Sequence, residues 1–223
     1  MTGILSIVAT PIGNLEDVTL RALRVLKEVD YVLCEDTRVT GKLLSHYDIS
    51  AKLVRYDAHA SEQVHQQILA DLEEGKHLAL VSDAGTPGVS DPGVLLVSKV
   101  HEAGVKVETI PGPSAVTAAF SISGVTGNQF MFLGFVPHKK GRQTFFEQVA
   151  AQGMPVIFYE STHRIMKALA SLTEVLDTQQ VIVARELTKL HEEVVRGSAK
   201  EVEAYFTEYT EKQKGEFVVI VAP

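Results

Sequence analysis

Residues 82–93, with the sequence SDAGTPGVSDPG, have the composition of a ligand-binding loop. They follow an apolar, β-branched run and precede a stretch of helical period, and ligands of open α/β sheets gather at such strand ends. The glycines let a ligand approach the backbone, and the prolines stiffen the chain. Polar groups come from Asp83, Thr86, Ser90 and Asp91. The loop lacks the lysine of a Walker A motif and the chain has no GxGxxG, so neither a nucleoside triphosphate nor a dinucleotide is favoured. A merely structural turn is the alternative interpretation.

Four more loops of this kind follow predicted strands. Residues 8–14 (VATPIGN) and 110–115 (IPGPSA) belong to the first half of the chain, and residues 158–164 (FYESTHR) and 184–189 (ARELTK) to the second. If the strands of the first half are adjacent, its three loops line one crevice. We expect the site in a cleft between the two halves.

The pattern along the chain predicts an α/β protein in which strands alternate with helices. The predicted strands span residues 4–9, 31–35, 53–56, 78–82, 105–110, 130–136, 155–160, 181–185, 193–196 and 217–221. Asp17 is expected to cap a helix with apolar positions Leu20, Leu23, Leu26 and Val29. A second helix is expected from Ser61 to about Gly75, with Val64, Ile68 and Leu72 on one face.

The proline- and glycine-rich stretch from Pro111 to Gly127 predicts a domain boundary. We expect a first α/β domain at residues 1–115, a linker at 116–127 and a second α/β domain at 128–223. The close spacing of the strands at 181–185 and 193–196 predicts a hairpin, and therefore a mixed second sheet. Ser198 and Glu201 form a capping-box pattern, after which a helix should bury Val202, Tyr205, Phe206 and Tyr209.

Composition excludes several classes of protein. The chain has 223 residues, 45% of them hydrophobic and 22% charged, which is typical of a soluble globular protein. The lack of a long apolar run or a leader pattern predicts a cytoplasmic protein without a membrane span. Cys34 is the only cysteine and is expected to be a buried bystander, so neither an intrachain disulfide nor a cysteine-rich metal site can form.

The net charge of −7 argues against broad, nonspecific binding to nucleic acid, but it leaves room for a local basic site. One candidate is the cluster at residues 138–142 (HKKGR). A second group is Arg38, Lys42, His46, Lys52 and Arg55. An ordinary solvated surface is the alternative for both.

Taken in order, these segments resemble the tetrapyrrole-methylase superfamily, and within it the ribosomal RNA small subunit methyltransferase I branch. The resemblance covers essentially the whole chain. It rests on VATPIGNL at 8–15, EDTR at 35–38, SDAGTPGVSDPG at 82–93, PGPSA at 111–115, FYES at 158–161 and ARELTK at 184–189. The porphyrin-methylating and diphthamide-forming branches usually have a glycine-rich first loop, and its absence here selects the RNA branch. Thr162 stands where relatives often have proline, which should affect only how the next helix begins.

The resemblance implies a two-domain, class III methyltransferase that is not Rossmann-like and works as a homodimer. Each domain would be a β-sheet flanked by helices. S-adenosylmethionine would bind folded in the cleft, and the product would be a 2'-O-methylated cytidine in the decoding region of 16S rRNA, within the 30S subunit; neither DNA nor a membrane is an expected partner. The residues expected to contact the cofactor are Pro11, Asp83, Ala84, Gly85, Thr86, Ser90, Asp91, Pro111, Gly112, Ser114, Ala115, Phe158, Tyr159, Glu160 and Leu187.

A ribose hydroxyl is a poor nucleophile, so a general base would help the transfer by about 10²–10⁴-fold. The candidate bases are Glu160, Glu186, a desolvated Lys189 and Asp36, and an internal ion pair of Glu186 with Arg185 is the alternative for that position. Phosphates would be held by Arg38, Lys139, Lys140 and Arg142.

Two rival functions share this sequence pattern. The same cleft could methylate a tetrapyrrole or a related small precursor, a substrate that suits an acidic protein. A non-catalytic module that binds an adenosine ligand is the other rival. Activity on RNA, on tetrapyrroles or on neither discriminates the three.

Overall fold

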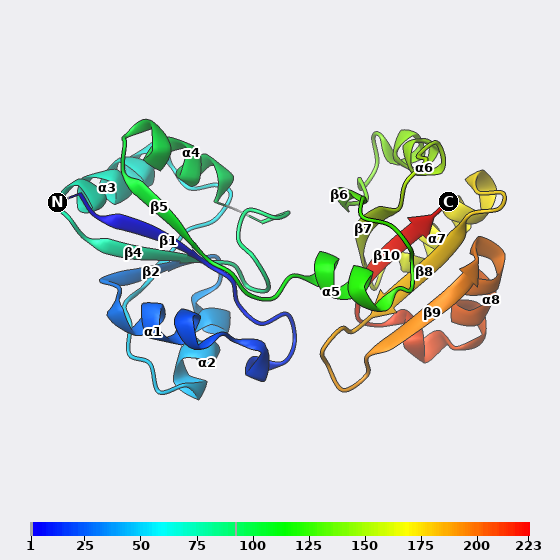
Figure 1. Cartoon of the computed structure of the whole chain (residues 1–223), viewed down its shortest axis with the longest axis horizontal. Helices are drawn as coiled ribbons and strands as arrows, with labels where there is room; N and C mark the ends of the chain where they lie inside the picture. The colour runs from blue at the N-terminus through cyan, green and yellow to red at the C-terminus, as the bar shows by residue number, and fades with distance from the viewer. Residues whose placement is uncertain (1, 92) are drawn as a thin grey trace. The chain divides into compact units, whose positions relative to one another are not determined.

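The computed structural model describes residues 2–91 and 93–223, and it divides the chain into two compact units, Met1–Ser114 and Ala115–Pro223 (Figure 1). All ten predicted strands are present, within one or two residues of the expected bounds. In the described residues no helix is both long and apolar enough to cross a membrane.

The first unit is a parallel sheet in the order β3-β2-β4-β1-β5. Its strands are β1 (Ile4–Val8), β2 (Tyr31–Cys34), β3 (Leu53–Arg55), β4 (His77–Val81) and β5 (Lys106–Ile110). Its helices are η1 (Leu15–Asp17), α1 (Leu20–Glu28), α2 (Thr37–His46), α3 (Glu62–Glu73) and α4 (Val94–Glu102).

Alternation along these strands gives the first sheet two apolar faces. Val8, Val32 and Val81 point to the face that α1 and α2 cover. Leu5, Leu33 and Leu80 point to the opposite face, which α3 and α4 cover. Cys34 is fully buried, as predicted. Since the strands are parallel, the loops that follow all of them emerge at one edge of the sheet.

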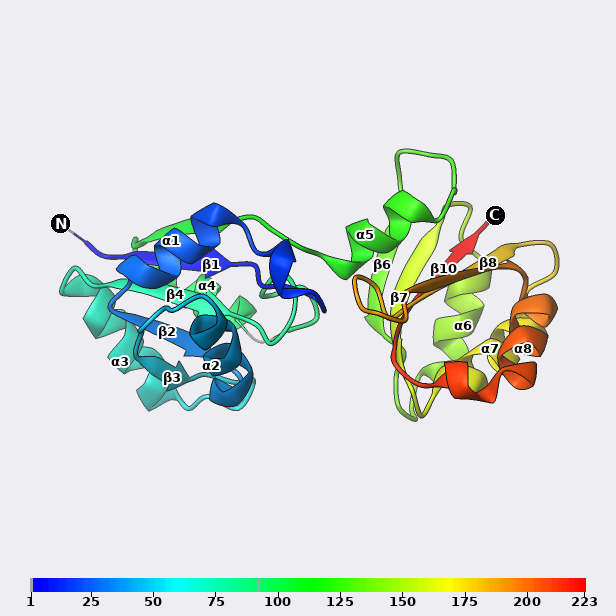
Figure 2. The same ribbon diagram turned by 90° about the horizontal axis from the view of Figure 1, so that it is seen from below.

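The second unit contains a mixed sheet in the order β6-β7-β10-β8-β9. The neighbouring strands β6 and β7 are parallel, and the other three neighbouring pairs are antiparallel. Its strands are β6 (Met131–Phe135), β7 (Val156–Ser161), β8 (Gln180–Arg185), β9 (Glu193–Ser198) and β10 (Glu216–Ala222). Its helices are α5 (Ala115–Ile122), α6 (Arg142–Ala150), α7 (Ile165–Val175), α8 (Ala199–Glu208) and η2 (Thr210–Gln213). Figure 2 shows α6, α7 and α8 together on one side of this sheet, where Phe146, Leu169 and Phe206 are fully buried. The predicted β8–β9 hairpin is confirmed.

Helix starts test the local predictions. Ser61 caps α3, and Ser198 and Glu201 form the expected capping box of α8. The cap predicted at Asp17 is wrong, because Asp17 ends η1 and the Thr19 side chain accepts from the amide of Ala22 instead. Two apolar residues expected to be buried are exposed, Leu20 at 86% and Tyr209 at 38%, because each lies at the end of its helix. Residues 116–127, predicted as a linker, begin inside α5, which packs against β10 and belongs to the second unit.

Candidate active site

Three loops of the first unit are tied together at the ends of the adjacent strands β4, β1 and β5. Thr10 and Gly85 exchange backbone hydrogen bonds of 2.9 and 3.0 Å, which join the loop after β1 to the loop after β4. The Thr86 hydroxyl donates to the Pro113 carbonyl at 3.1 Å, which joins the loop after β4 to the loop after β5. The predicted convergence of the three first-half loops is therefore present, and it consists mostly of backbone contacts.

Gly85 lies at the centre of this junction and has a φ of +83°, a conformation that costs any other residue energy. An added Cβ would lie 3.4 Å from Ile12 Cγ2. That distance is an ordinary van der Waals contact, so the left-handed backbone conformation is what favours glycine at this position.

Carboxylates gather at the same edge of the first sheet. Partial burial, followed by the nearby charge of Asp83, raises the pKa of Glu35. Burial raises the pKa of Asp91 to about 6, with a further contribution from Glu35. Asp83 is exposed and accepts a hydrogen bond from the amide of Asp36 at 3.1 Å. A cationic ligand would relieve the mutual repulsion of these groups.

Asp36 caps α2 and is held by its neighbour. The Arg38 amide and guanidinium both donate to it, with Nη2 at 2.6 Å from Oδ2, and these hydrogen bonds keep the pKa of Asp36 well below its usual range. A carboxylate so stabilised is a weak base. The Arg38 side chain itself is 86% exposed, which leaves it accessible to other anions.

In the second unit, Glu160 is buried among arginines at the end of β7. Its side chain has no exposed surface, and its Oε1 lies 2.9 Å from Arg164 Nη2 while its Oε2 lies 3.7 Å from Arg142 Nη1. Arg164 also donates to the Val136 carbonyl at 2.8 Å, and the Arg142 guanidinium stacks over the Phe146 ring. This cluster joins β6, α6 and β7 within the unit.

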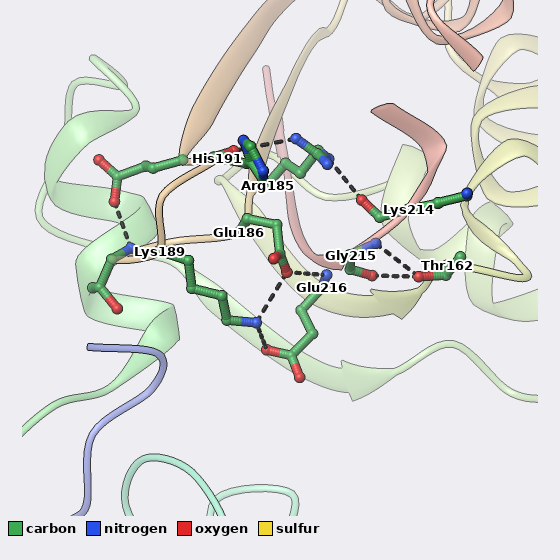
Figure 3. Close-up of polar contacts among 10 residues, drawn as sticks. Thr162, Arg185, Glu186, Lys189, His191, Lys214, Gly215 and Glu216 are labelled. Carbon is green, nitrogen blue, oxygen red and sulfur yellow. Dashed lines mark hydrogen bonds and ion pairs between the residues drawn. The ribbon is translucent and has the colours of Figure 1, made fainter. Parts of the chain in front are cut away.

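A second charged cluster follows β8, where Lys189 lies between two carboxylates (Figure 3). Its Nζ is 2.9 Å from Glu186 Oε1 and 2.9 Å from Glu216 Oε2. Burial lowers the pKa of Lys189, but the two carboxylates outweigh it and hold the pKa above its ordinary value. Burial alone would raise the pKa of Glu186, but the hydrogen bond from Lys189 outweighs burial, so the pKa of Glu186 lies below its ordinary value. Both groups are charged at neutral pH.

The backbone around this cluster is strained. Glu186 and Thr188 have φ values of +50° and +66°, which are uncommon for residues other than glycine. Glu186 Oε1 also accepts from the amide of Glu216, and a Cβ on Gly215 would lie 2.6 Å from Glu186 Cγ. Thr162 donates to the Gly215 carbonyl and accepts from its amide, as Figure 3 shows. Thr162, which stands where relatives often have proline, thus ties the turn after β7 to the turn before β10. Its effect is wider than the predicted one on the start of the next helix.

Comparisons with known proteins place this chain. Residues 5–203 match the family Tetrapyrrole (Corrin/Porphyrin) Methylases. The chain is 42% identical to ribosomal RNA small subunit methyltransferase I of Thermotoga maritima, over 99% of this chain and 98% of that protein. It is 46% identical to the protein of the same name from Synechocystis, over 99% of this chain and 79% of that protein. The chain belongs to the tetrapyrrole methylase family.

Solved structures of tetrapyrrole methylases share the fold of this one. A cobalt precorrin-4 methyltransferase of cobalamin biosynthesis superposes with a TM-score of 0.69 at 18% identity, covering 98% of this chain and 94% of that chain. Uroporphyrin-III-C-methyltransferase from Thermus thermophilus gives 0.68 at 18% identity, covering 99% and 94%. The predicted family and fold class are confirmed, including the mixed second sheet.

Several residues of this methylase that were predicted to contact a ligand or to act as a base are buried or paired with other side chains. Phe158 has no exposed surface and packs on Phe145 and Phe146, so its ring cannot enclose a ligand. Glu160 is too deeply buried to take a proton from a ribose, and Lys189 is a protonated partner of carboxylates and has no free lone pair. Arg142, expected to contact phosphate, instead faces Glu160 with a side chain only 18% exposed.

Other predicted residues remain accessible. Lys139 and Lys140 are exposed in the loop before α6, and Asp83, Ala84, Ser90, Pro111 and Gly112 are exposed in the first-unit loops. Pro11, Ser114, Ala115 and Tyr159 are half-buried, and Leu187 is 7% exposed. Arg185 does not pair with Glu186 but donates to the carbonyls of Lys214 and His191.

The sequence interpretation missed the partners of these groups. Glu216 and Arg164 complete the two charged clusters of the second unit, and Glu35 contributes to the acidic edge of the first. Glu35 had a usable signal, since it comes directly after a buried strand in the EDTR segment. No sequence signal pointed to Glu216, because it lies 27 residues from its partner Lys189.

Proposed function

We propose that this chain is an S-adenosylmethionine-dependent methyltransferase that methylates the ribose 2'-hydroxyl of a cytidine in the decoding region of 16S rRNA. It acts in the cytoplasm on the 30S subunit, and as a homodimer. The observation that carries the proposal is the 42–46% identity, over nearly the whole chain, to proteins named ribosomal RNA small subunit methyltransferase I.

The first-unit loops suit the donor by their chemistry. S-adenosylmethionine carries a positive sulfonium and an ammonium group, and the edge formed by Glu35, Asp83 and Asp91 is acidic. Gly112 is exposed, and without a side chain its backbone allows close approach of a ligand. We assign the methionine end of the donor to the loop from Asp83 to Asp91. We assign the adenosine to Pro11 and to residues 111–114, which follow strands of the first unit.

The donor supplies an electrophilic methyl group on a sulfonium, and the protein's residues align the acceptor with it and exclude water. Among the four candidate bases, Glu186 is the one we retain, because its side chain is 18% exposed and unprotonated at neutral pH. Its lowered pKa makes it a weak base, so alignment should provide most of the acceleration. Arg38, Lys139 and Lys140 hold RNA phosphates.

The test is incubation with labelled S-adenosylmethionine and one of three substrates: 30S particles, naked 16S rRNA or tetrapyrroles. We expect label in the RNA of 30S particles, located by nuclease digestion and mass spectrometry on the ribose of one cytidine. Label in tetrapyrroles alone would replace this function by the rival one, and donor binding without any transfer would favour a binding module. Glu186→Gln in single-turnover assays then tests the base, and an unchanged rate rejects it.

A further inference from the structure

The first unit contains a pocket of about 210 Å³, and of the residues that shape it only Asp91 belongs to the cofactor and RNA assignments above. It lies between the turn after β3, the first turns of α3 and the segment that enters α4. The residues that shape it are Tyr56, Asp57, Ala58, His65, Asp91 and Val94. Its volume is below the roughly 300–1,000 Å³ of pockets for drug-sized ligands, which favours one small ring.

A buried polar pair forms part of the wall of this pocket. Tyr56 and His65 are each 3% exposed, and Tyr56 Oη lies 3.1 Å from His65 Nε2. In the described residues His65 Nδ1 has no hydrogen-bond partner, and Glu62 Oε2 is 3.8 Å away. A buried nitrogen without a partner costs free energy unless a ligand or water meets it. When Tyr56 donates to Nε2, Nδ1 carries the ring proton and can donate to a ligand.

Asp57 presents a fixed carboxylate at the same pocket. Its Oδ1 accepts from the amide of His59 at 2.8 Å, and its Oδ2 lies 2.9 Å from Arg55 Nη2. The Asp57 side chain is 22% exposed, so lone pairs remain accessible. An ionised carboxylate only accepts hydrogen bonds, so it selects ligands that present a donor.

Two exposed arginines lie at this edge of the sheet, and Arg55 is tied to the pocket by its ion pair with Asp57. Arg55 is 75% exposed and ends β3, and it pairs in register with Cys34 of β2. Arg38 follows β2 at the start of α2 and is 86% exposed. A concave pocket for a ring, with one exposed guanidinium paired to its carboxylate and another at the same edge of the sheet, has the layout of a nucleotide site.

We propose that this pocket receives the base of the target nucleotide and selects cytosine, with Asp57 accepting from the exocyclic amine and Arg38 and Arg55 meeting the flanking phosphates. The assignment rests on the RNA methyltransferase function proposed above. Cytosine presents an amine beside a ring nitrogen, whereas uracil presents a carbonyl oxygen that a carboxylate repels. The base would enter the pocket unstacked from the RNA.

Adenine presents the same amine beside a ring nitrogen, so the adenine of S-adenosylmethionine is the alternative occupant of this pocket. The size of the pocket favours the single ring of cytosine. Measurements on donor and RNA separately distinguish the two occupants.

The experiment compares Asp57→Asn with the wild type on 30S particles that carry cytidine or uridine at the methylated nucleotide. We expect the single-turnover rate on cytidine to fall about 10- to 100-fold and the cytidine-to-uridine rate ratio to narrow by a similar factor. The dissociation constant for S-adenosylmethionine, measured by calorimetry, should stay unchanged. Asp177→Asn in the second unit removes the same charge and should change neither rate nor ratio.

A second variant guards against misfolding of the first. Ala58 is exposed and lines the pocket, so Ala58→Leu should fill it without disturbing the core, lowering RNA methylation while donor affinity stays the same. An unchanged rate ratio in Asp57→Asn would overturn the proposal, as would a parallel loss of donor affinity, which would give the pocket to the donor's adenine. If the wild type methylates no RNA at all, the proposed function fails first and the cytosine assignment fails with it.

Discussion

The charged groups at the strand ends of the two units have opposite surroundings. In the first unit, burial and neighbouring carboxylates raise the pKa of Glu35 and Asp91. In the second unit, Glu160 lies beside Arg164 and Glu186 beside Lys189. At the first edge Asp36 and Asp57 pair with arginines, but the raised pKa values of Glu35 and Asp91 indicate local negative charge that a cation would stabilise. In the second unit, Glu160 and Glu186 already have cationic partners. We infer that the first edge binds the cationic donor, that the Glu160 cluster is structural, and that in the Lys189 cluster Glu186 alone keeps a proposed role as the base.

The largest expected effect is on stability, from Glu160→Gln. The substitution leaves the Arg164 and Arg142 guanidiniums without a buried counter-charge, which should lower the free energy of unfolding by roughly 3 kcal/mol. Urea unfolding followed by a probe in the second unit measures it. Glu174→Gln on the exposed side of α7 is the control and should stay within about 0.5 kcal/mol of the wild type. Equal stability of the two variants would mean that the Glu160 cluster is not structural.

Donor affinity should respond to the exposed carboxylates of the first edge. Asp83→Ala removes an exposed carboxylate that the amide of Asp36 orients, and we expect S-adenosylmethionine binding to weaken by about 10- to 100-fold because a charge-assisted contact is lost. Calorimetry measures this, with Asp177→Ala as the charge-matched control. Intact affinity in Asp83→Ala would remove the loop after β4 from the donor site and erase the contrast between the units.

The elements and the first-unit loops followed from the sequence because their signals are local. Glycine and proline after a β-branched run mark the loop at residues 82–93, and parallel strands place such loops at one edge. The failures have a common cause, which is that partners came from distant segments. Lys189 looked like a desolvated base, and its pairing with Glu216 could not be read from a 27-residue separation. Arg142 looked like a phosphate ligand because its neighbours are lysines, yet Glu160 on β7 attracts it.

The pocket beside Asp57 was missed for a different reason. The segment at residues 56–59 (YDAH) has no glycine or proline to mark a binding loop. The hollow depends on how α3 and the start of α4 pack beside it, which is tertiary information. Only the position of Tyr56 and Asp57 directly after a strand pointed to that edge of the sheet.

Donor binding should also depend on pH through Asp91, whose pKa is about 6. A cation binds the ionised form better, so affinity should be nearly complete above pH 7 and fall by up to about tenfold as the pH drops to 5 and Asp91 takes up its proton. Calorimetry across pH 5 to 8 measures this profile. Asp91→Asn should bind more weakly at pH 7 and flatten the profile. A profile that keeps its full slope in Asp91→Asn would place the titration on another group.

The smallest expected effect comes from two glycines with nearly the same backbone. Gly85 in the first unit has a φ of +83° and Gly141 in the second has +86°, so alanine at either position should cost about 1 kcal/mol of stability. Their surroundings differ, because a Cβ on Gly85 would contact Ile12 in the loop after β1, whereas a Cβ on Gly141 meets nothing within 4 Å. Gly85 is hydrogen-bonded to Thr10 within the loop junction, so the strain of Gly85→Ala should disturb the junction and weaken S-adenosylmethionine binding by about three- to tenfold, a loss of roughly 1 kcal/mol. Gly141→Ala should leave the dissociation constant unchanged. Equal losses of donor affinity would show that the effect is one of general stability, since the two variants share their backbone strain and differ in whether that strain falls on the loop junction.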